Sequence, residues 1–350
     1  MPELRPIPLT ANQPRHFYRG GGNIGRFRGA APPDDYRPED WVGSATCRFG
    51  ADALGLTVLP DGRTLPAAIA TDPAGWLGPA HLDRWGDTPA LLVKLLDAGQ
   101  RLPVHCHPSR DFAGAHLGSA FGKTEAWLVV DVPEGGEGQV YLGFQEEVAE
   151  RRLREWSRVQ DRMAILEATN PVTVRPGDAV LVPAGLPHAV DAGVFLVEIQ
   201  EPTDFSVLIE WAGFAPYGGT EGHLRLGWDT ALRCVDRRAW SKEEIAGLVR
   251  RPSALAESAP GVRRVLPESA DPYFRAELVG AGAELAESFA VLVVLGGIGE
   301  LEPSEGEPLP LKAGETLLVP YGSGPATVHG EVEVLRCLPP SPGTPPGGGV

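Results

Sequence analysis

The sequence is poor in cysteine, in long apolar runs and in positive charge, and each shortage argues against a class of protein. Its four cysteines, at positions 47, 106, 234 and 337, form no Cys-x-x-Cys pair and are too sparse for a disulfide framework. The longest apolar run, residues 289–295, is too short to span a bilayer, and the opening residues lack the apolar core of a signal peptide. The formal net charge of −15 disfavours general nucleic-acid binding. We therefore expect a cytoplasmic protein with reduced cysteines that binds neither membranes nor nucleic acids.

Glycine and proline, by contrast, are abundant, with 44 and 35 of the 350 residues. Such frequent turn residues suit a mainly β protein better than a helical bundle. Hydrophobic residues make up 43% and charged residues 22%, which is typical of a globular protein, and the length allows two or more cores. The negative net charge also means that an anionic substrate must be met by a local positive pocket.

Two short patterns bring metal-binding residue types together. In the run His-Cys-His at 105–107, His105 and His107 share one face of a strand and the cysteine points to the other. Glu125 begins the next apolar run, and His188 ends a Gly-x5-Pro-x-Gly-x2-His pattern. Imidazole and carboxylate suit zinc, iron, manganese or nickel, and four such ligands leave positions open for water or substrate. Unrelated histidines are the alternative, but two interlocking patterns favour a metal site.

These patterns resemble the two motifs of the cupin superfamily. The longer runs at 89–97, 105–108, 122–125 and 182–189 are similar to class I mannose-6-phosphate isomerases, within a resemblance that extends over about residues 80–204. The resemblance implies one bound divalent metal ion, which is zinc in that family. It also implies a sugar phosphate substrate and the interconversion of mannose 6-phosphate and fructose 6-phosphate through an enediol.

Charged residues near these motifs are candidates for substrate binding and catalysis. Lys94 interrupts an apolar run, so we expect it to pair with a core carboxylate or to contact an anionic ligand. Lys123 lies two residues before Glu125 and therefore points to the same face, where it could bind phosphate or transfer a proton; a solvated strand end is the alternative. Glu198 and Asp204 resemble carboxylates that the family places near its substrate, so we expect catalytic roles for both and for Lys123.

The sequence departs from the family at three positions. Leu208 stands where the family has an arginine that steadies the charge of the intermediate, and losing such a donor costs about 10²–10³ in rate. Arg225 is a candidate replacement and hence a candidate substrate-binding residue. The N-terminal tryptophan of the family is replaced near Tyr18, and His105 stands where many members have glutamine.

Changes in periodicity divide the chain into segments. Residues 146–168 switch to helical spacing, which predicts a helical insertion within a metal-binding cupin domain at 1–235. We expect a second cupin-like domain at 236–338 and, because proline and glycine dominate there, a flexible tail at 339–350. The predicted fold is thus mainly β, with two cupin-type jelly-roll β-barrels and an inserted helical segment.

An internal repeat supports the second barrel. Gly177 opens the frame Gly-x5-Pro-x-Gly that leads to His188, and Gly314 opens the same frame again. Pro325 stands in the position that His188 has in the first copy, and no His-x-His precedes it. We therefore predict that the second barrel keeps the turn geometry, has no metal site and serves a structural purpose.

The leading hypothesis is a metal-dependent aldose–ketose isomerase. Three other functions are compatible with the same residues: a cupin oxygenase that uses iron or manganese, a sugar-binding or regulatory homologue without activity, and an isomerase of a related sugar. The last two gain support from the replaced arginine and tryptophan.

Overall fold

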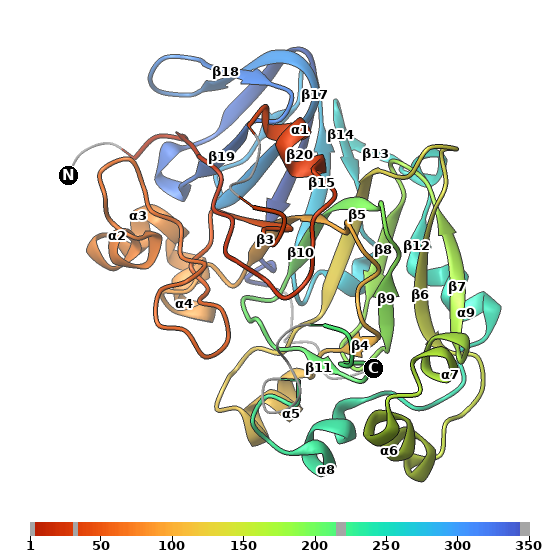
Figure 1. Ribbon diagram of the computed structural model, residues 1–350. Helices are drawn as coiled ribbons and strands as arrows, with labels where there is room; N and C mark the ends of the chain where they lie inside the picture. The colour runs from red at the N-terminus through yellow and green to blue at the C-terminus, as the bar shows by residue number, and fades with distance from the viewer. Residues whose placement is uncertain (1–3, 31–33, 215–221, 344–350) are drawn as a thin grey trace.

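The computed structural model describes residues 4–30, 34–214 and 222–343, and Figure 1 shows their course. Among these residues the named strands form three sheets whose strand pairs are antiparallel. The expected mainly β class is confirmed, whereas the description as two jelly-roll barrels stays a prediction. Most of the predicted tail lies outside the described residues.

A six-stranded sheet forms the middle layer of the described structure. In spatial order its strands are β12 (Val249–Arg250), β8 (Ala179–Val182), β5 (Glu125–Asp131), β10 (Phe195–Gln200), β3 (Leu92–Asp97) and β2 (Glu39–Val42). Strands β3, β5 and β10 are buried on both faces over most of their length, which explains why they are almost continuously apolar. Alternate residues of β5, β8 and β10 belong to different core clusters, as a period of two requires.

A five-stranded sheet covers one face of the middle layer. Its strands, in spatial order, are β11 (Val207–Leu208), β4 (His105–Cys106), β9 (His188–Val190), β6 (Gly138–Phe144) and β7 (Thr169–Val174). Trp127 and Leu196 of the middle layer share a core cluster with Val140 and Val190 of this sheet. The space between these two sheets is where the site described below is formed.

A nine-stranded sheet packs against the other face of the middle layer. Its main path is β1 (Ile7–Pro8), β19 (Thr316–Val319), β17 (Ala290–Pro303), β20 (Ala326–Leu338), β15 (Arg275–Val279), β14 (Val262–Arg264) and β13 (Glu257–Ala259), with β16 (Glu284–Leu285) beside β20 and β18 (Leu309–Lys312) beside β17. Val197 and Ile199 of β10 share a core cluster with Val291 and Leu335 of this sheet. The chain thus forms three stacked layers.

Short helices lie between the strands. They are α1 (Asn23–Arg28), α2 (Leu65–Thr71), α3 (Pro73–Leu77), α4 (Pro79–Trp85), α5 (Arg110–His116), α6 (Glu150–Val159), α7 (Arg162–Glu167), α8 (Trp228–Ala231) and α9 (Lys242–Leu248). Helices α6 and α7 confirm the predicted helical insertion, and Figure 1 shows them well separated from the group α2 to α4. Among the described residues, no helix combines the length and the apolar character needed to cross a membrane.

Strand pairing crosses the expected division between the two units in both directions. Strand β1, from the N-terminus, pairs with β19 in the C-terminal sheet, while β12 pairs with β8 in the middle layer. The division at residue 235 remains a prediction. If the chain is divided there, each part contributes one strand to a sheet of the other part.

Candidate functional site

Two neighbouring strands of the five-stranded sheet aim the three motif histidines at one point. His105 in β4 lies directly opposite His188 in β9, and His107 follows at the end of β4 on the same face as His105. The ring centroids are 4.1 Å apart for His105 and His188 and 4.9 Å apart for His107 and His188. Cys106 points the other way into a separate core cluster, as predicted.

The outer nitrogen of each imidazole is held by a backbone carbonyl. The Nδ1 atoms of His105, His107 and His188 lie 2.8, 2.7 and 2.8 Å from the carbonyl oxygens of Pro103, Phe205 and Leu186. A carbonyl only accepts hydrogen bonds, so each Nδ1 carries the proton and each Nε2 has a lone pair directed inward. Histidines that ligate a metal are usually oriented by hydrogen bonds of this kind.

Glu125, the first residue of β5, completes the inner set from the opposite sheet. Its Oε2 lies 3.0 Å from His107 Nε2 and its Oε1 lies 3.3 Å from His188 Nε2. Both His188 Nε2 and Glu125 Oε2 are buried without a hydrogen bond of good geometry. A divalent cation would satisfy both atoms, so the residues present fit a metal with nitrogen and oxygen ligands.

The electrostatics favour the metal-binding forms of these residues. Burial, together with its histidine neighbours, holds the pKa of His105 well below its usual value, and burial with Lys123 lowers the pKa of His107 to about 3. Burial alone would raise the pKa of Glu125, but Lys123 and His107 hold it well below the usual range. Neutral imidazoles and an ionised carboxylate are the forms that bind a cation.

Lys123 connects the metal-binding residues to a further carboxylate. Its Nζ lies 2.9 Å from Glu125 Oε2, 3.1 Å from His107 Nε2 and 3.1 Å from Glu198 Oε1. Although burial opposes the charged form, Glu125 and Glu198 raise the pKa of Lys123. The predicted shared face of Lys123 and Glu125 is therefore present, and the lysine is buried rather than solvated at a strand end.

Glu198 lies on the middle of β10, where its neighbours across the sheet are Lys94 on β3 and Trp127 on β5. Its side chain is buried, and its Oε1 has no hydrogen bond of good geometry. Burial raises the pKa of Glu198 to about 7, although Lys123 opposes the shift. A carboxyl group with this pKa can both accept and return a proton near neutral pH.

Lys94 has the core partners that the sequence allowed for, and it also lines the pocket. Its Nζ lies 3.2 Å from Glu39 Oε2 and 3.9 Å from both Glu198 Oε1 and Asp204 Oδ1. Asp204 is fixed from its other side, because its Oδ2 accepts a hydrogen bond of 3.1 Å from the backbone N–H of Phe49.

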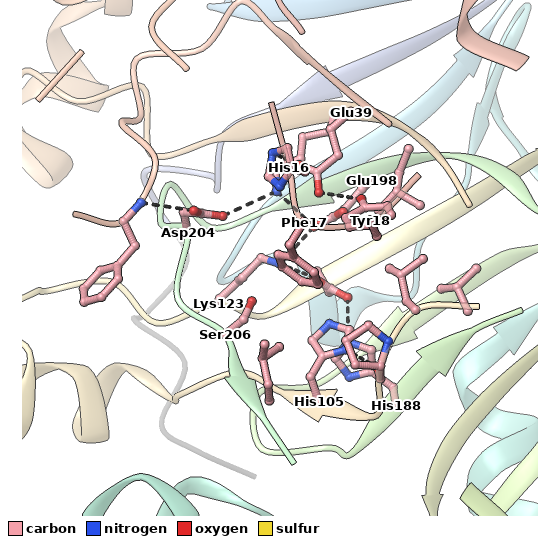
Figure 2. Close-up of a pocket in the computed structure, with 18 of the residues that line it drawn as sticks. His16, Phe17, Tyr18, Glu39, His105, Lys123, His188, Glu198, Asp204 and Ser206 are labelled. Atoms are coloured by element: carbon pink, nitrogen blue, oxygen red, sulfur yellow. Dashed lines mark hydrogen bonds and ion pairs between the residues drawn. The ribbon is translucent and has the colours of Figure 1, made fainter. Parts of the chain in front are cut away.

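One pocket is lined by His105, His188, Glu125, Lys123, Glu198, Lys94 and Asp204 (Figure 2), while His107 lies behind Lys123 and Glu125, which it contacts. Figure 2 shows Lys123 between the imidazoles of His105 and His188 on one side and His16 with Glu39 on the other. The pocket lies between the middle layer, which supplies Lys94, Glu125 and Glu198, and the five-stranded sheet, which supplies the histidines.

Sequence reasoning missed three ionisable residues of the pocket: His16, Glu39 and Arg48. Burial lowers the pKa of His16, whose Nε2 lies 3.3 Å from Glu39 Oε2. Burial opposes the charged form of Glu39, but His16 and Lys94 hold its pKa well below the usual range. Only Glu39 had a signal in the sequence, since it precedes Trp41 by two residues and so shares its face in β2.

The structure also places the residues where the sequence departs from the family. Leu208, buried in β11, lines the pocket as an apolar wall. Arg225 is exposed and does not itself line the pocket; its guanidinium lies 5.5 Å from the ring centre of Phe49, which does. Tyr18 also lines the pocket, and its hydroxyl donates a hydrogen bond of 2.6 Å to Glu39.

No family model matches the chain. Among curated proteins it is similar to the mannose-6-phosphate isomerase ManA of Bacillus subtilis (strain 168), with 28% identity over 262 residues, which are 71% of this chain and 75% of the relative.

Solved structures show a likeness over nearly the whole length. The mannose 6-phosphate isomerase of Bacillus subtilis superposes with a TM-score of 0.73 at 22% identity, covering 95% of this chain and 99% of that structure. A zinc-bound mannose 6-phosphate isomerase superposes with a TM-score of 0.70 at 16% identity, covering 97% and 100%. At these identities the structures show the fold alone, and the curated relative adds a likeness in sequence over most of the chain. The chain is thus similar in sequence and in fold to mannose-6-phosphate isomerases, and its two motifs are consistent with the cupin superfamily.

Proposed function

We propose that the protein is a metal-dependent isomerase that interconverts mannose 6-phosphate and fructose 6-phosphate. The observation that carries the proposal is the convergence of three imidazoles, each oriented by a backbone carbonyl, on a pocket that also holds Glu198 and Lys123. The curated relative named for this activity supports the choice of substrate.

His105, His107, His188 and Glu125 would hold one divalent ion, and we propose zinc because the solved relative contains it. A bound dication polarises the oxygens of a sugar and so lowers the cost of negative charge on them. The sequence alone left iron, manganese and nickel open, and the donor set is compatible with each of them.

Glu198 is the residue that we assign to proton transfer between the two carbon atoms. Its carboxylate takes the proton from the carbon next to the carbonyl, and the electrons of that C–H bond form the double bond of an enediol. The same carboxyl group then returns the proton to the former carbonyl carbon. In the course of the reaction the former carbonyl oxygen gains a proton and the hydroxyl oxygen on the neighbouring carbon loses one, so the aldose becomes a ketose. A pKa of about 7, produced by burial, suits a group that must act in both directions.

Lys123 and Asp204 would complete the reaction at the oxygen atoms. Lys123, with its ammonium 3.1 Å from Glu198 Oε1, can donate a hydrogen bond to the oxygen on which charge develops. Asp204, held by the N–H of Phe49, can accept a hydrogen bond from a sugar hydroxyl. In this assignment Lys94 mainly orients Glu198 and Asp204, both 3.9 Å away.

We further propose that the protein acts in the cytoplasm. All four cysteines are free thiols, which suits a reducing compartment.

One observation favours a second candidate, an isomerase of a related sugar. Leu208 stands where the family has an arginine after the aspartate. Leu208 and Leu224 together make one wall of the pocket apolar. A sugar with a different, less polar substituent could pack against this wall.

A coupled assay of fructose 6-phosphate formation from mannose 6-phosphate, on zinc-loaded protein, tests the proposal. We expect turnover that disappears in a His188→Ala blank. If the zinc-loaded protein does no better than the blank with this substrate but turns over another aldose in a panel, the second candidate replaces the first. If it turns over none, a binding protein without activity becomes the better description.

A further inference from the structure

Among the described residues, the pocket is lined by one arginine, Arg48, to which no role has been assigned above. We propose that Arg48, assisted by Arg225, binds the anionic group of the substrate at the end of the pocket away from the metal ligands. This inference rests on the proposed function for the identity of that group, a phosphate monoester.

The two lysines of the pocket are poorly placed for this purpose. The side chains of Lys94 and Lys123 are only 3% and 5% exposed, and each is shared among buried carboxylates. Lys94 faces Glu39 and Lys123 faces Glu125, so a phosphate brought to either lysine would also meet the partner carboxylate. Like charges at such distances repel strongly in a buried site.

Arg48 lines the same pocket from a different direction. It lies on the segment that follows β2 and is half-buried, with Nη1 donating a hydrogen bond of 3.0 Å to the carbonyl oxygen of Arg15. Its charge helps to lower the pKa of His16, a smaller effect than the burial of that imidazole, so the guanidinium acts on the His16 side of the pocket. Figure 2 places His16 on the opposite side of Lys123 from His105 and His188.

Arg225 reaches the neighbourhood of Arg48 from another part of the chain. Its guanidinium lies 5.5 Å from the ring centre of Phe49, the residue after Arg48. Gly50 makes the approach possible, because a Cβ there would lie 2.7 Å from Nη2 of Arg225, and because its φ of +80° favours glycine. Arg225 thus lies beside the residue that follows Arg48, and guanidinium groups bind phosphate with paired hydrogen bonds.

The arrangement matches the shape of the proposed substrate. In a hexose 6-phosphate the reacting carbons and the phosphate are at opposite ends of the molecule. With the reacting carbons near the imidazoles and Glu198, the phosphate would reach the His16 side, where Arg48 lies. The protein has a net charge of −15, which repels anions. A local pair of arginines would offset this repulsion and favour anion binding at this end of the pocket.

The test compares binding of mannose 6-phosphate and of unphosphorylated mannose to zinc-loaded protein by calorimetry. We expect wild type to prefer the phosphate ester, Arg48→Gln to weaken its binding by about ten- to a hundredfold, and Arg225→Gln to weaken it by roughly two- to fivefold. Binding of mannose should be the same in all variants. Arg63→Gln, which removes an exposed arginine paired with Asp61, controls for the change in net charge.

The proposal is overturned if Arg48→Gln binds mannose 6-phosphate like wild type, if it weakens both sugars equally, or if wild type does not distinguish them. Kinetics separate this result from the proposed function. Turnover of mannose 6-phosphate with an unchanged KM in Arg48→Gln would leave the isomerase standing and remove the anion site. If binding depends on Arg48 but no turnover is seen, the anion site stands and the proposed isomerase activity falls.

Discussion

The strand that leads to His188 and the strand that leads to Pro325 begin with the same turn and end in different surroundings. Gly177 before β8 and Gly314 before β19 have φ values of +85° and +89°, so both copies of the frame use a left-handed glycine. After β8 the chain turns into β9 and delivers an imidazole to a polar pocket, whereas after β19 it enters β20.

The surroundings of the two turns explain why only one serves a site. Near β9, buried charged groups such as Lys123, Glu125 and Glu198 converge from two sheets. In the C-terminal sheet the buried Arg336 is instead paired with Glu277 at 3.2 Å and with a backbone carbonyl. Within the described residues, the histidines at 105, 107 and 188 form the group with metal-binding geometry. The shared turn is therefore a structural device, and the chemistry depends on what faces it.

The largest expected effect comes from removing a ligand on the metal-binding side. His107→Ala should lose most of its bound zinc and lower isomerase activity by roughly 10³-fold or more, because an inner ligand and the charge stabilisation that depends on it are lost together. Metal analysis after dialysis and the coupled assay measure both effects. His329→Ala, in the C-terminal strand β20 where its ring pairs with Glu302 at 2.7 Å, is the matched control and should change neither quantity.

Glu198→Gln should lower kcat by about 10²–10⁴-fold while leaving zinc bound, because it removes the proton acceptor and none of the ligands. Burial raises the pKa of Glu198 to about 7, so the carboxylate form is gained as the pH rises through that value. We therefore expect wild-type kcat to increase roughly tenfold from pH 6 to pH 8 and the residual rate of the variant to be flat. A wild-type rate independent of pH over this range would contradict the assignment.

Trp127→Phe should have an intermediate effect on the metal. The indole Nε1–H donates a hydrogen bond of 3.0 Å to Glu125 Oε1, and losing such a second-shell partner lowers metal affinity about 10- to 100-fold. Competition with a zinc chelator measures the change. Trp240→Phe loses an equivalent hydrogen bond to Asp236 elsewhere, so equal affinities in the two variants would count against a special role for Trp127.

Leu311→Ala tests the structural purpose of the C-terminal sheet and should have the smallest effect on activity. Leu311 is fully buried in the aliphatic cluster of that sheet, so its truncation should cost about 2–5 kcal/mol in the free energy of unfolding. Chemical denaturation measures the loss. Zinc content and kcat at 25 °C should be unchanged, and a large drop in kcat of the folded variant would show that this sheet does more than support the fold.

The metal ligands could be predicted because their geometry is local. A spacing of two residues places His105 and His107 on one face, and a fixed turn frame delivers His188. The same spacing of two residues predicted that Lys123 shares a face with Glu125. The apolar runs of β3 and β10 likewise reveal buried strands, and the period of α6 reveals its buried side.

His16 and Arg48 could not be predicted, because tertiary packing alone brings them into the pocket. Both precede β3 by more than 40 residues and lie outside the described helices and strands, so no periodicity marks the side that they face. The exchange of β1 and β12 between the two units escaped prediction for a similar reason, since strand partners distant in sequence leave no local pattern. The residues near the predicted metal site could thus be predicted from the sequence, whereas many residues at the opposite end of the pocket could not.

The most direct test of the central claim is a metal titration of the stripped protein with mannose 6-phosphate as substrate. Three histidines and Glu125 around one point predict that the isomerase rate rises in proportion to added zinc and stops rising at one equivalent. Stripped protein that is as active as loaded protein, or loaded protein that is inactive at one equivalent, would contradict the account.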